Sequence, residues 1–392
     1  MVTVRKGQFA LVSPIIHRLL RNKWNVRVVQ CERFWEQIEH FLLKKRSLTS
    51  FYTSNPQKTE SKTSKYALRF LPRILLFLTK MVRLERPDVL VVMTEGVLPA
   101  QVAVAMAHLR KVPTFLFLQA LGVVGYNYGY NLLCDRIAVP CILLKDLIVK
   151  SGVSEERIRV TGRPIYDVLC DSEKRFDKTA ICEELGLEVD KKILVYCTDN
   201  LPQNQVMTFA ICKAVQNFSD LQFVIKVHPS EPSISMYKKL CGDLGLQSVI
   251  TKDVDIYKVL YVCDLLITGF STTVLDAMIL KKPVITVNLT GLPDPIPFAE
   301  SKVAIGVYHE SDIEKAIRNG LYSCPIKPED RERFVFEQAF LTDGKATERV
   351  VTSIEQMVRE HFERLRFQKV LKDLNETWEV MVIEESRLRD CG

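Results

Sequence analysis

The sequence lacks paired cysteines, a signal-peptide core and any long uninterrupted apolar run. Its 11 cysteines are an odd number, and no two are spaced as C-x-x-C, so neither a zinc-ligand cluster nor a disulfide framework is indicated. The N-terminal residues contain no apolar run of the kind that a signal peptide needs. The most apolar stretch, residues 66–82, is interrupted by Arg69, Pro72, Arg73 and Lys80, so it is not expected to cross a bilayer. These absences predict a cytoplasmic protein with reduced thiols.

Glycine and proline are also scarce, with 16 and 17 residues among 392, which excludes a collagen-like or low-complexity chain. Hydrophobic residues make up 47% of the sequence and charged residues 26%, the balance of a globular protein. A chain of this length is too long for one ordinary hydrophobic core. It predicts two domains of roughly 150–200 residues each.

Acidic residues are nearly absent from residues 41–83. This segment holds ten Lys or Arg and one acid, Glu60, whereas the whole chain has a formal charge of +7. A nucleic-acid-binding protein is expected to spread basic charge over its main fold, so the imbalance argues against that class and favours one local anionic contact. The apolar and basic residues 70–83 have the composition of an interfacial helix on anionic lipid. The alternative is a core helix that precedes the next strand and keeps its cations outside.

Strand-like apolar runs alternate with helix-like segments, which is typical of an α/β fold with parallel sheets. We predict two doubly wound, Rossmann-like domains that face a central cleft, over residues 1–165 and 191–350, with a linker at 166–190 and a helical tail at 351–392. Ligands of open α/β sheets bind beyond the carboxyl ends of the strands, so the cleft is the expected site. The strand candidates are residues 26–29, 89–93, 114–118 and 136–139 in the first half and 192–197, 222–227, 265–268 and 283–288 in the second.

A His-Pro pair, His228-Pro229, follows the strand candidate at 222–227. Proline ends the strand, so the imidazole is expected at a strand tip rather than within a ladder. A histidine at such a tip can donate a hydrogen bond to a phosphate or act in acid–base chemistry. The alternative is a structural histidine that caps a turn.

A second motif follows the strand candidate at 265–268. Gly269 permits a sharp turn, and three hydroxyl residues, Ser271, Thr272 and Thr273, open the next helix. A helix N-terminus offers free N–H groups, and hydroxyls add donors, so this segment is a candidate phosphate cradle. Asp276 lies about one turn further on, where a carboxylate can accept the hydroxyls of a nucleotide ribose. The alternatives are that Ser271 is a plain helix cap and that Asp276 is a solvated helix acid.

These motifs, together with the run D-A-M-I-L-K-K-P-V-I from Asp276 to Ile285, resemble the donor-binding half of GT-B-fold glycosyltransferases. The resemblance is nearest to the surface-polysaccharide group, which includes polysialyltransferase-like and CDP-glycerol-transferase-like enzymes, and to UDP-N-acetylglucosamine 2-epimerases of the same superfamily. It implies that His228 and the hydroxyl motif bind the donor phosphate and that Asp276 binds the ribose.

The first half extends the resemblance. Glu95 follows the strand candidate at 89–93 and precedes Gly96; related sialyl- and polysialyltransferases carry an acidic pair before a glycine here, the first of which is Thr94 in this chain, and the resemblance implies that Glu95 is the general base on the acceptor hydroxyl. The alternative is a surface acid at a strand end. Residues 160–167 resemble the interdomain hinge of the family. Within it, Arg163 is expected to face either a phosphate or a structural ion partner.

Taken together, the sequence predicts an inverting, metal-independent glycosyltransferase that moves a sugar from a nucleotide-sugar donor to a surface-polysaccharide or lipid-linked acceptor, with no cofactor. It is expected to lie in the cytoplasm, with a peripheral contact of residues 41–83 on the anionic inner face of the membrane. The pair Asp253 and Asp255 is expected to cap a helix rather than to hold a metal. The rivals are a UDP-N-acetylglucosamine 2-epimerase, a CDP-polyol phosphotransferase and a non-catalytic nucleotide-sugar sensor.

Overall fold

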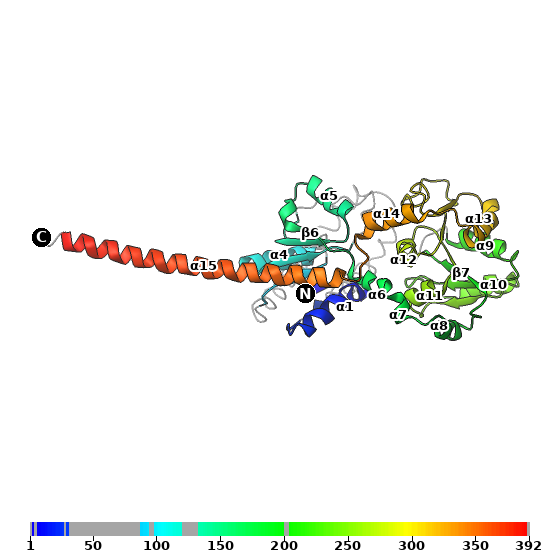
Figure 1. Ribbon diagram of the computed structural model, residues 1–392, viewed down its shortest axis with the longest axis horizontal. Helices are drawn as coiled ribbons and strands as arrows, with labels where there is room; N and C mark the ends of the chain where they lie inside the picture. Colours follow the sequence, from blue (N-terminus) through cyan, green and yellow to red (C-terminus); the bar gives the residue numbers. More distant parts are fainter. Residues whose placement is uncertain are drawn as a thin grey trace, which may run out of the picture.

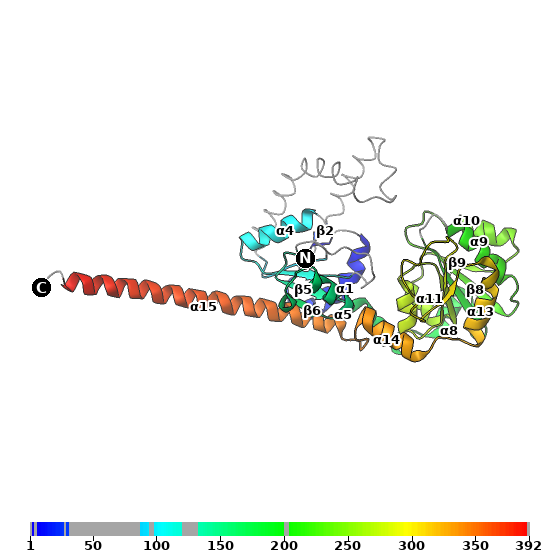
Figure 2. The same cartoon turned by 90° about the horizontal axis from the view of Figure 1, so that it is seen from above.

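The chain folds into two α/β lobes with a long helix that runs out from between them (Figures 1 and 2). The computed structural model describes residues 2–3, 6–26, 29–30, 87–93, 98–119, 132–199 and 204–389. Each lobe is built on a parallel sheet of six strands. The predicted α/β class with two doubly wound sheets is therefore confirmed.

The N-terminal sheet has the order β2-β1-β3-β4-β5-β6. Its central strands are buried along their whole length, as expected for parallel strands covered by helices on both faces. The strands are β1 Val2–Thr3, β2 Val29–Gln30, β3 Leu90–Val92, β4 Thr114–Phe117, β5 Arg136–Val139 and β6 Ile158–Val160, and the helices are α1 Lys6–Arg21, α4 Leu98–Leu109, α5 Ile142–Lys150 and the short η2 Glu155–Arg157.

The C-terminal sheet has the order β12-β11-β10-β7-β8-β9. Counted from β7, this is the 3-2-1-4-5-6 order of dinucleotide-binding folds, which reverses between its first and fourth strands, here β7 and β10. The strands are β7 Lys192–Cys197, β8 Leu221–Lys226, β9 Val249–Thr251, β10 Leu265–Thr268, β11 Val284–Val287 and β12 Ile305–Val307, and the helices are α8 Lys178–Leu185, α9 Asn204–Val215, α10 Ser235–Asp243, α11 Ile256–Val262, α12 Thr273–Ile279, α13 Ile313–Tyr322 and α14 Pro328–Ala339, with η4 Glu310–Asp312 before α13.

Local sequence signals explain where helices of this lobe begin and end. The Asp177 carboxylate accepts hydrogen bonds from the backbone N–H groups of Thr179 and Ala180, and α8 ends at Gly186, whose φ of 68° suits the left-handed region. Asp255 caps α11 in the same way, through the backbone N–H of Tyr257 at 2.9 Å. The expectation that Asp255 caps a helix is therefore confirmed.

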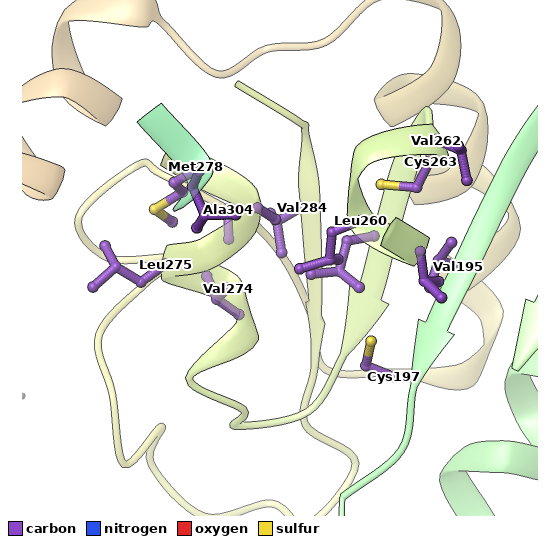
Figure 3. Close-up of a cluster of buried hydrophobic side chains, with 14 of the residues drawn as sticks. Val195, Cys197, Leu260, Val262, Cys263, Val274, Leu275, Met278, Val284 and Ala304 are labelled. Atoms are coloured by element: carbon purple, nitrogen blue, oxygen red, sulfur yellow. The ribbon is translucent and has the colours of Figure 1, made fainter. Parts of the chain in front are cut away.

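A continuous apolar layer packs the helices of the C-terminal lobe onto its sheet. On one face, side chains of β7, β10 and β11 meet those of α11 and α12 (Figure 3). Residues of that layer are fully or almost fully buried, among them Val195, Cys197, Leu260, Val262, Cys263, Val274, Leu275, Met278 and Val284. Rigid packing of this kind fixes the strand ends at which the candidate site lies.

The chain passes between the lobes twice. It leaves β6 through η3 Pro164–Tyr166, α6 Asp167–Cys170 and α7 Ser172–Arg175, and it returns from α14 into α15 Ala346–Arg389, a single helix of 44 residues. The first turns of α15 pack with α1 in the core of the N-terminal lobe, through Val350, Val351, Ile354 and Met357. Further along α15, Leu365 is half-buried, and Phe362, Leu371 and Leu374 are 42–51% exposed.

Candidate active site

The candidate site lies where the strand order of the C-terminal sheet reverses. The carboxyl ends of β7 and β10 are neighbours there, and a cavity of about 110 Å³ is lined by residues that follow β7, β10 and β11, with two side chains of α9. Its lining is mostly apolar, and the polar groups that face it come from the strand ends. The lining residues are Asp199, Val206, Met207, Gly269, Phe270, Val287, Asn288, Leu289 and Thr290.

Asp199, which follows β7, was not among the predicted site residues. It is only 6% exposed, and its Oδ2 accepts a hydrogen bond from the backbone N–H of Phe270 at 3.0 Å. Burial raises the pKa of its carboxyl, while the N–H groups of Phe270 and Gly269 and the nearby His228 oppose that rise. The Asp199 carboxyl group therefore already occupies a backbone donor of the predicted phosphate loop. The signal that could have found it is a polar pair, Thr198-Asp199, directly after a buried strand.

His228 lies at the carboxyl side of β8, two strands away from Gly269 and so about 10 Å across the sheet. Its backbone N–H donates to Thr198 Oγ1 at 2.9 Å. Its Nδ1 accepts a hydrogen bond from the backbone N–H of Ser230 at 3.2 Å. Because Nδ1 is the acceptor, a neutral imidazole carries its proton on Nε2. The loop thus holds the tautomer that can donate from Nε2 to an anionic ligand.

The loop that carries His228 is anchored by a buried glutamate. Glu231 is 8% exposed, and its two carboxylate oxygens accept short hydrogen bonds from Thr198 Oγ1 and Tyr237 Oη. Tyr237 Oη also accepts from Asn204 Nδ2 at 2.6 Å, and Asn204 Oδ1 accepts from Tyr196 Oη at 2.8 Å. This connected network fixes the loop through buried, fully used polar groups. Glu231 is a further residue that the sequence analysis missed, although it stands only three positions after His228.

Removing one hydroxyl from this network tests how much the network contributes to the stability of the fold. We expect Tyr237→Phe to lower the free energy of unfolding by about 1–3 kcal/mol, because it leaves a buried Glu231 oxygen and the Asn204 amide each short of a partner. Urea denaturation of the variant and the wild type measures the difference. The matched control is Tyr322→Phe, which removes an exposed hydroxyl bonded to Asp220 and is expected to change stability by less than about 0.5 kcal/mol. Equal effects of the two variants would contradict an anchoring role.

The predicted phosphate loop follows β10 as expected. Ser271 Oγ accepts hydrogen bonds from Thr273 Oγ1 at 2.9 Å and from the backbone N–H of Thr273 at 3.3 Å, so it caps the start of α12. Thr272 directly precedes the first residue of that helix. Ser271 thus serves the first N–H of α12 from one position before the N-cap residue Thr272, whose side chain makes no cap hydrogen bond. Phosphate binding by Gly269, Ser271, Thr272 and Thr273 stays a prediction.

Gly269 is required by close packing. A Cβ at this position would overlap Asp199 Oδ2, so we expect Gly269→Ala to cost about 1–3 kcal/mol of stability, as overpacking does, and to displace Asp199 from the loop. Gly242→Ala in α10 is the matched control, because a Cβ there meets nothing within 4 Å and alanine is the better helix former. Thermal unfolding of both variants measures the contrast. A Gly269→Ala protein as stable as wild type would show that the contact between Gly269 and the Asp199 carboxylate leaves room for a Cβ.

Asp276 occupies a closed cluster rather than the lining of the cavity. It is 8% exposed, and the Arg163 guanidinium and the Tyr166 hydroxyl lie near its carboxylate. Tyr166 Oη in turn accepts a short hydrogen bond from Arg163 Nη1, and the Arg163 guanidinium lies 4.7 Å from the Tyr166 ring centroid. Burial raises the pKa of Asp276 to about 6, with Arg163 and Tyr166 opposing the rise. The structure thus brings two predicted site residues, Arg163 and Asp276, into one cluster. The binding of a ribose by Asp276 stays a prediction.

The two segments that pass between the lobes are hydrogen-bonded to each other beside this cluster. The Asp167 carboxylate accepts hydrogen bonds from the backbone N–H groups of Ala346 and Thr347, at 2.9 and 2.8 Å, where α15 begins. Arg349 donates to the Thr161 carbonyl at 2.8 Å and to both carboxylate oxygens of Asp343. The hinge-like segment 160–167 is therefore held to the opposite crossing by hydrogen bonds at Asp167 and Thr161, and the ion pair with Asp343 orients the Arg349 guanidinium that makes one of them.

On the N-terminal side, β3 ends at Val92, at the reversal point of its sheet between β1 and β3. Glu95 and the basic segment 41–83 lie outside the described residues, so both assignments stay predictions.

In the described part of the chain, no group of three or more His, Cys, Asp or Glu side chains is placed to hold a metal ion. Likewise, no helix within the described ranges combines the length and the apolarity needed to span a membrane.

Solved structures identify the fold as GT-B-like. A UDP-GlcNAc 2-epimerase from Neisseria meningitidis bound to UDP-GlcNAc shares 15% identity, with a TM-score of 0.58 over 91% of this chain and 98% of that one. MnaA of S. aureus with UDP shares 16% identity, with a TM-score of 0.61 over 91% of this chain and 96% of that one. The wall teichoic acid polymerase TagF soaked with CDPG shares 17% identity, with a TM-score of 0.51 over 70% of this chain and 73% of that one. At these identities the likeness establishes the architecture alone.

A family model matches part of the sequence. Residues 150–290 match the model of CDP-Glycerol:Poly(glycerophosphate) glycerophosphotransferase, a span that contains Arg163, His228 and the loop from Gly269 to Asp276. No curated protein sequence matches the chain significantly. The predicted resemblance to the surface-polysaccharide GT-B group is confirmed. Residues 150–290 match the CDP-glycerol transferase model, and solved UDP-GlcNAc 2-epimerases share the fold.

Proposed function

We propose that this protein is a transferase that takes a group from a nucleotide-activated donor and places it on a hydroxyl of a surface-polymer or lipid-linked acceptor. The observation that carries the proposal is the placement of Asp199 and the loop that begins at Gly269 at the strand-order reversal of the C-terminal sheet, with His228 at the end of the adjoining strand β8. That is the place where nucleotides bind in open α/β sheets. The family-model match over the same residues supports it.

In this proposal the C-terminal lobe binds the donor. The Nε2–H of His228 donates to the phosphate that becomes the leaving group, where it stabilises the charge that develops as the bond breaks. The hydroxyls of Ser271 and Thr272 serve the same phosphate, and Asp276 reaches the ribose if the Arg163 and Tyr166 cluster opens. Glu95 acts as the general base that takes the proton from the attacking acceptor hydroxyl.

Two kinds of donor fit this scheme. With a nucleotide sugar, the acceptor oxygen attacks the anomeric carbon and a nucleoside diphosphate leaves. With a CDP-polyol, the acceptor oxygen attacks phosphorus, the polyol phosphate is transferred and CMP leaves. The sequence resemblance favours the sugar donor, and the family-model match favours the polyol donor. No cofactor or metal is part of either scheme.

A nucleotide panel tests the proposal directly. We expect one of UDP, CDP, CMP or GDP, at about 100 times its Kd, to stabilise the protein by about 2.7 kcal/mol and to raise its Tm by several degrees. A flat response to all four nucleotides would contradict nucleotide binding.

The donor that belongs to the best nucleotide is then followed by phosphorus and proton nuclear magnetic resonance, with and without an acceptor. Release of CMP with transfer of phosphate identifies the polyol reaction, and release of a nucleoside diphosphate identifies the sugar reaction. Conversion of a UDP-sugar to its 2-epimer without any acceptor would replace the transferase proposal with an epimerase.

A further inference from the structure

The distal part of α15 presents an apolar stripe that the lobes do not cover. Met357 and Val358 are buried, and an ion pair at 2.7 Å joins Glu360 of the helix to Arg136 of the body. Beyond that point the helix runs away from the N-terminal lobe in both views (Figures 1 and 2). The distal part of the helix therefore projects beyond the N-terminal lobe.

Four large apolar side chains on this projecting part share one face. Phe367, Val370, Leu371 and Leu374 stand at positions i, i+3, i+4 and i+7, and they are 62%, 52%, 45% and 51% exposed. That spacing forms an apolar stripe of the kind a helix buries against a partner. In sequence the same spacing continues at Trp378 and Met381. A contiguous exposed stripe of this size marks an interaction surface.

The charges along the same segment select the partner and its direction. Residues 364–372 carry four basic side chains and no acid, whereas residues 373–385 carry five acids and no basic side chain. A second copy in parallel would set like charges side by side, which is destabilising. A second copy in the antiparallel direction sets the basic block of one helix along the acidic block of the other, in both halves of the pair.

We propose that α15 forms an antiparallel helix pair with α15 of a second copy, so that the protein is a two-fold symmetric dimer. The two charge blocks together span 22 residues, or about 33 Å of helix. Such an interface is isologous, with the same stripe contributed by each copy. The pair lies away from the candidate active site, so the proposal stands independently of the proposed function.

Sedimentation velocity of the full chain over a hundredfold concentration range tests the pairing. The wild type is expected to sediment as a dimer at micromolar concentration. The triple variant Phe367→Ser, Leu371→Ser, Leu374→Ser is expected to be monomeric over the whole range with an unchanged Tm, because these side chains lie outside the lobes. The control is Phe362→Ser, which removes a 42% exposed aromatic from another side of the helix and is expected to leave the dimer intact. A monomeric wild type, or a triple variant that still dimerises, would overturn the proposal.

Salt dependence tests the direction. Because opposite charges lie together in the antiparallel pair, raising NaCl from 50 to 500 mM is expected to weaken dimerisation at least several-fold. The reference is the charge-neutralised variant Lys369→Gln, Lys372→Gln, Glu376→Gln, Glu379→Gln, in which this weakening should be smaller. A dimer that salt strengthens more in the wild type than in this reference has the parallel arrangement, and the antiparallel proposal then fails.

Discussion

His228→Ala is expected to lower the rate of group transfer by about 10²–10³-fold, because it removes the Nε2–H donor from the phosphate on which charge develops. The variant should stay folded, since His228 is only partly buried and its backbone contact with Thr198 is kept. Product formation with the donor identified by the nucleotide panel is the measurement. Donor affinity is expected to fall as well, because the same hydrogen bond forms in the ground state.

Two further variants make this result specific. His309→Ala removes an exposed histidine that precedes η4 and is expected to leave transfer unchanged. Ser230→Ala removes the hydroxyl beside His228 Nδ1 but keeps the backbone N–H that sets the tautomer, so a loss well below that of His228→Ala is expected. Transfer at the wild-type rate by His228→Ala would remove this residue from the mechanism.

Much of the fold could be predicted because buried parallel strands leave a continuous apolar signal. The runs around Leu90, Ile193 and Ile285 each lie in an observed strand. The strands β6, β9 and β12 were not predicted. Each has three residues, and β9 is only half-buried throughout. Short edge strands of this kind need little apolar surface, so their sequences resemble loops.

The site was predictable only in part, for a related reason. His228 and Gly269 stand out because each follows a strongly apolar strand, and the structure places Gly269 at the reversal point of the sheet and His228 one strand beyond it, after β8. Asp199 follows a strand too, but a Thr-Asp pair is also typical of an ordinary turn. The partners of Asp276 could not be predicted, because Arg163 and Tyr166 reach it from the other side of the linker, more than 100 positions away.

The cluster of Arg163, Tyr166 and Asp276 is expected to make a large contribution to stability. Arg163→Met is expected to lower the free energy of unfolding at pH 7.5 by about 3 kcal/mol. This is the lower end of the cost of leaving a buried carboxylate without its compensating cation, because Arg163 acts on Asp276 through electrostatic attraction and not through a direct ion pair. Methionine keeps much of the apolar volume of the arginine stem, so the loss reports the charge. Urea denaturation measures it, with Arg318→Met as control, since Arg318 forms an exposed i,i+4 pair with Glu314 that contributes at most about 0.5 kcal/mol.

The pH dependence identifies Asp276 as the origin of the effect. Its folded-state pKa of about 6 lies above the unfolded value near 3.8, so the folded state binds the proton more tightly. The resulting stabilisation is fully present below about pH 4 and is lost as the pH rises through 6. Without Arg163 that pKa should rise further, so the deficit of Arg163→Met should shrink markedly between pH 7.5 and pH 5. In the Asp276→Asn background the deficit should vary little over the same range. A deficit that is equally pH-dependent in both backgrounds would mean that Arg163 stabilises the hinge through a group other than Asp276.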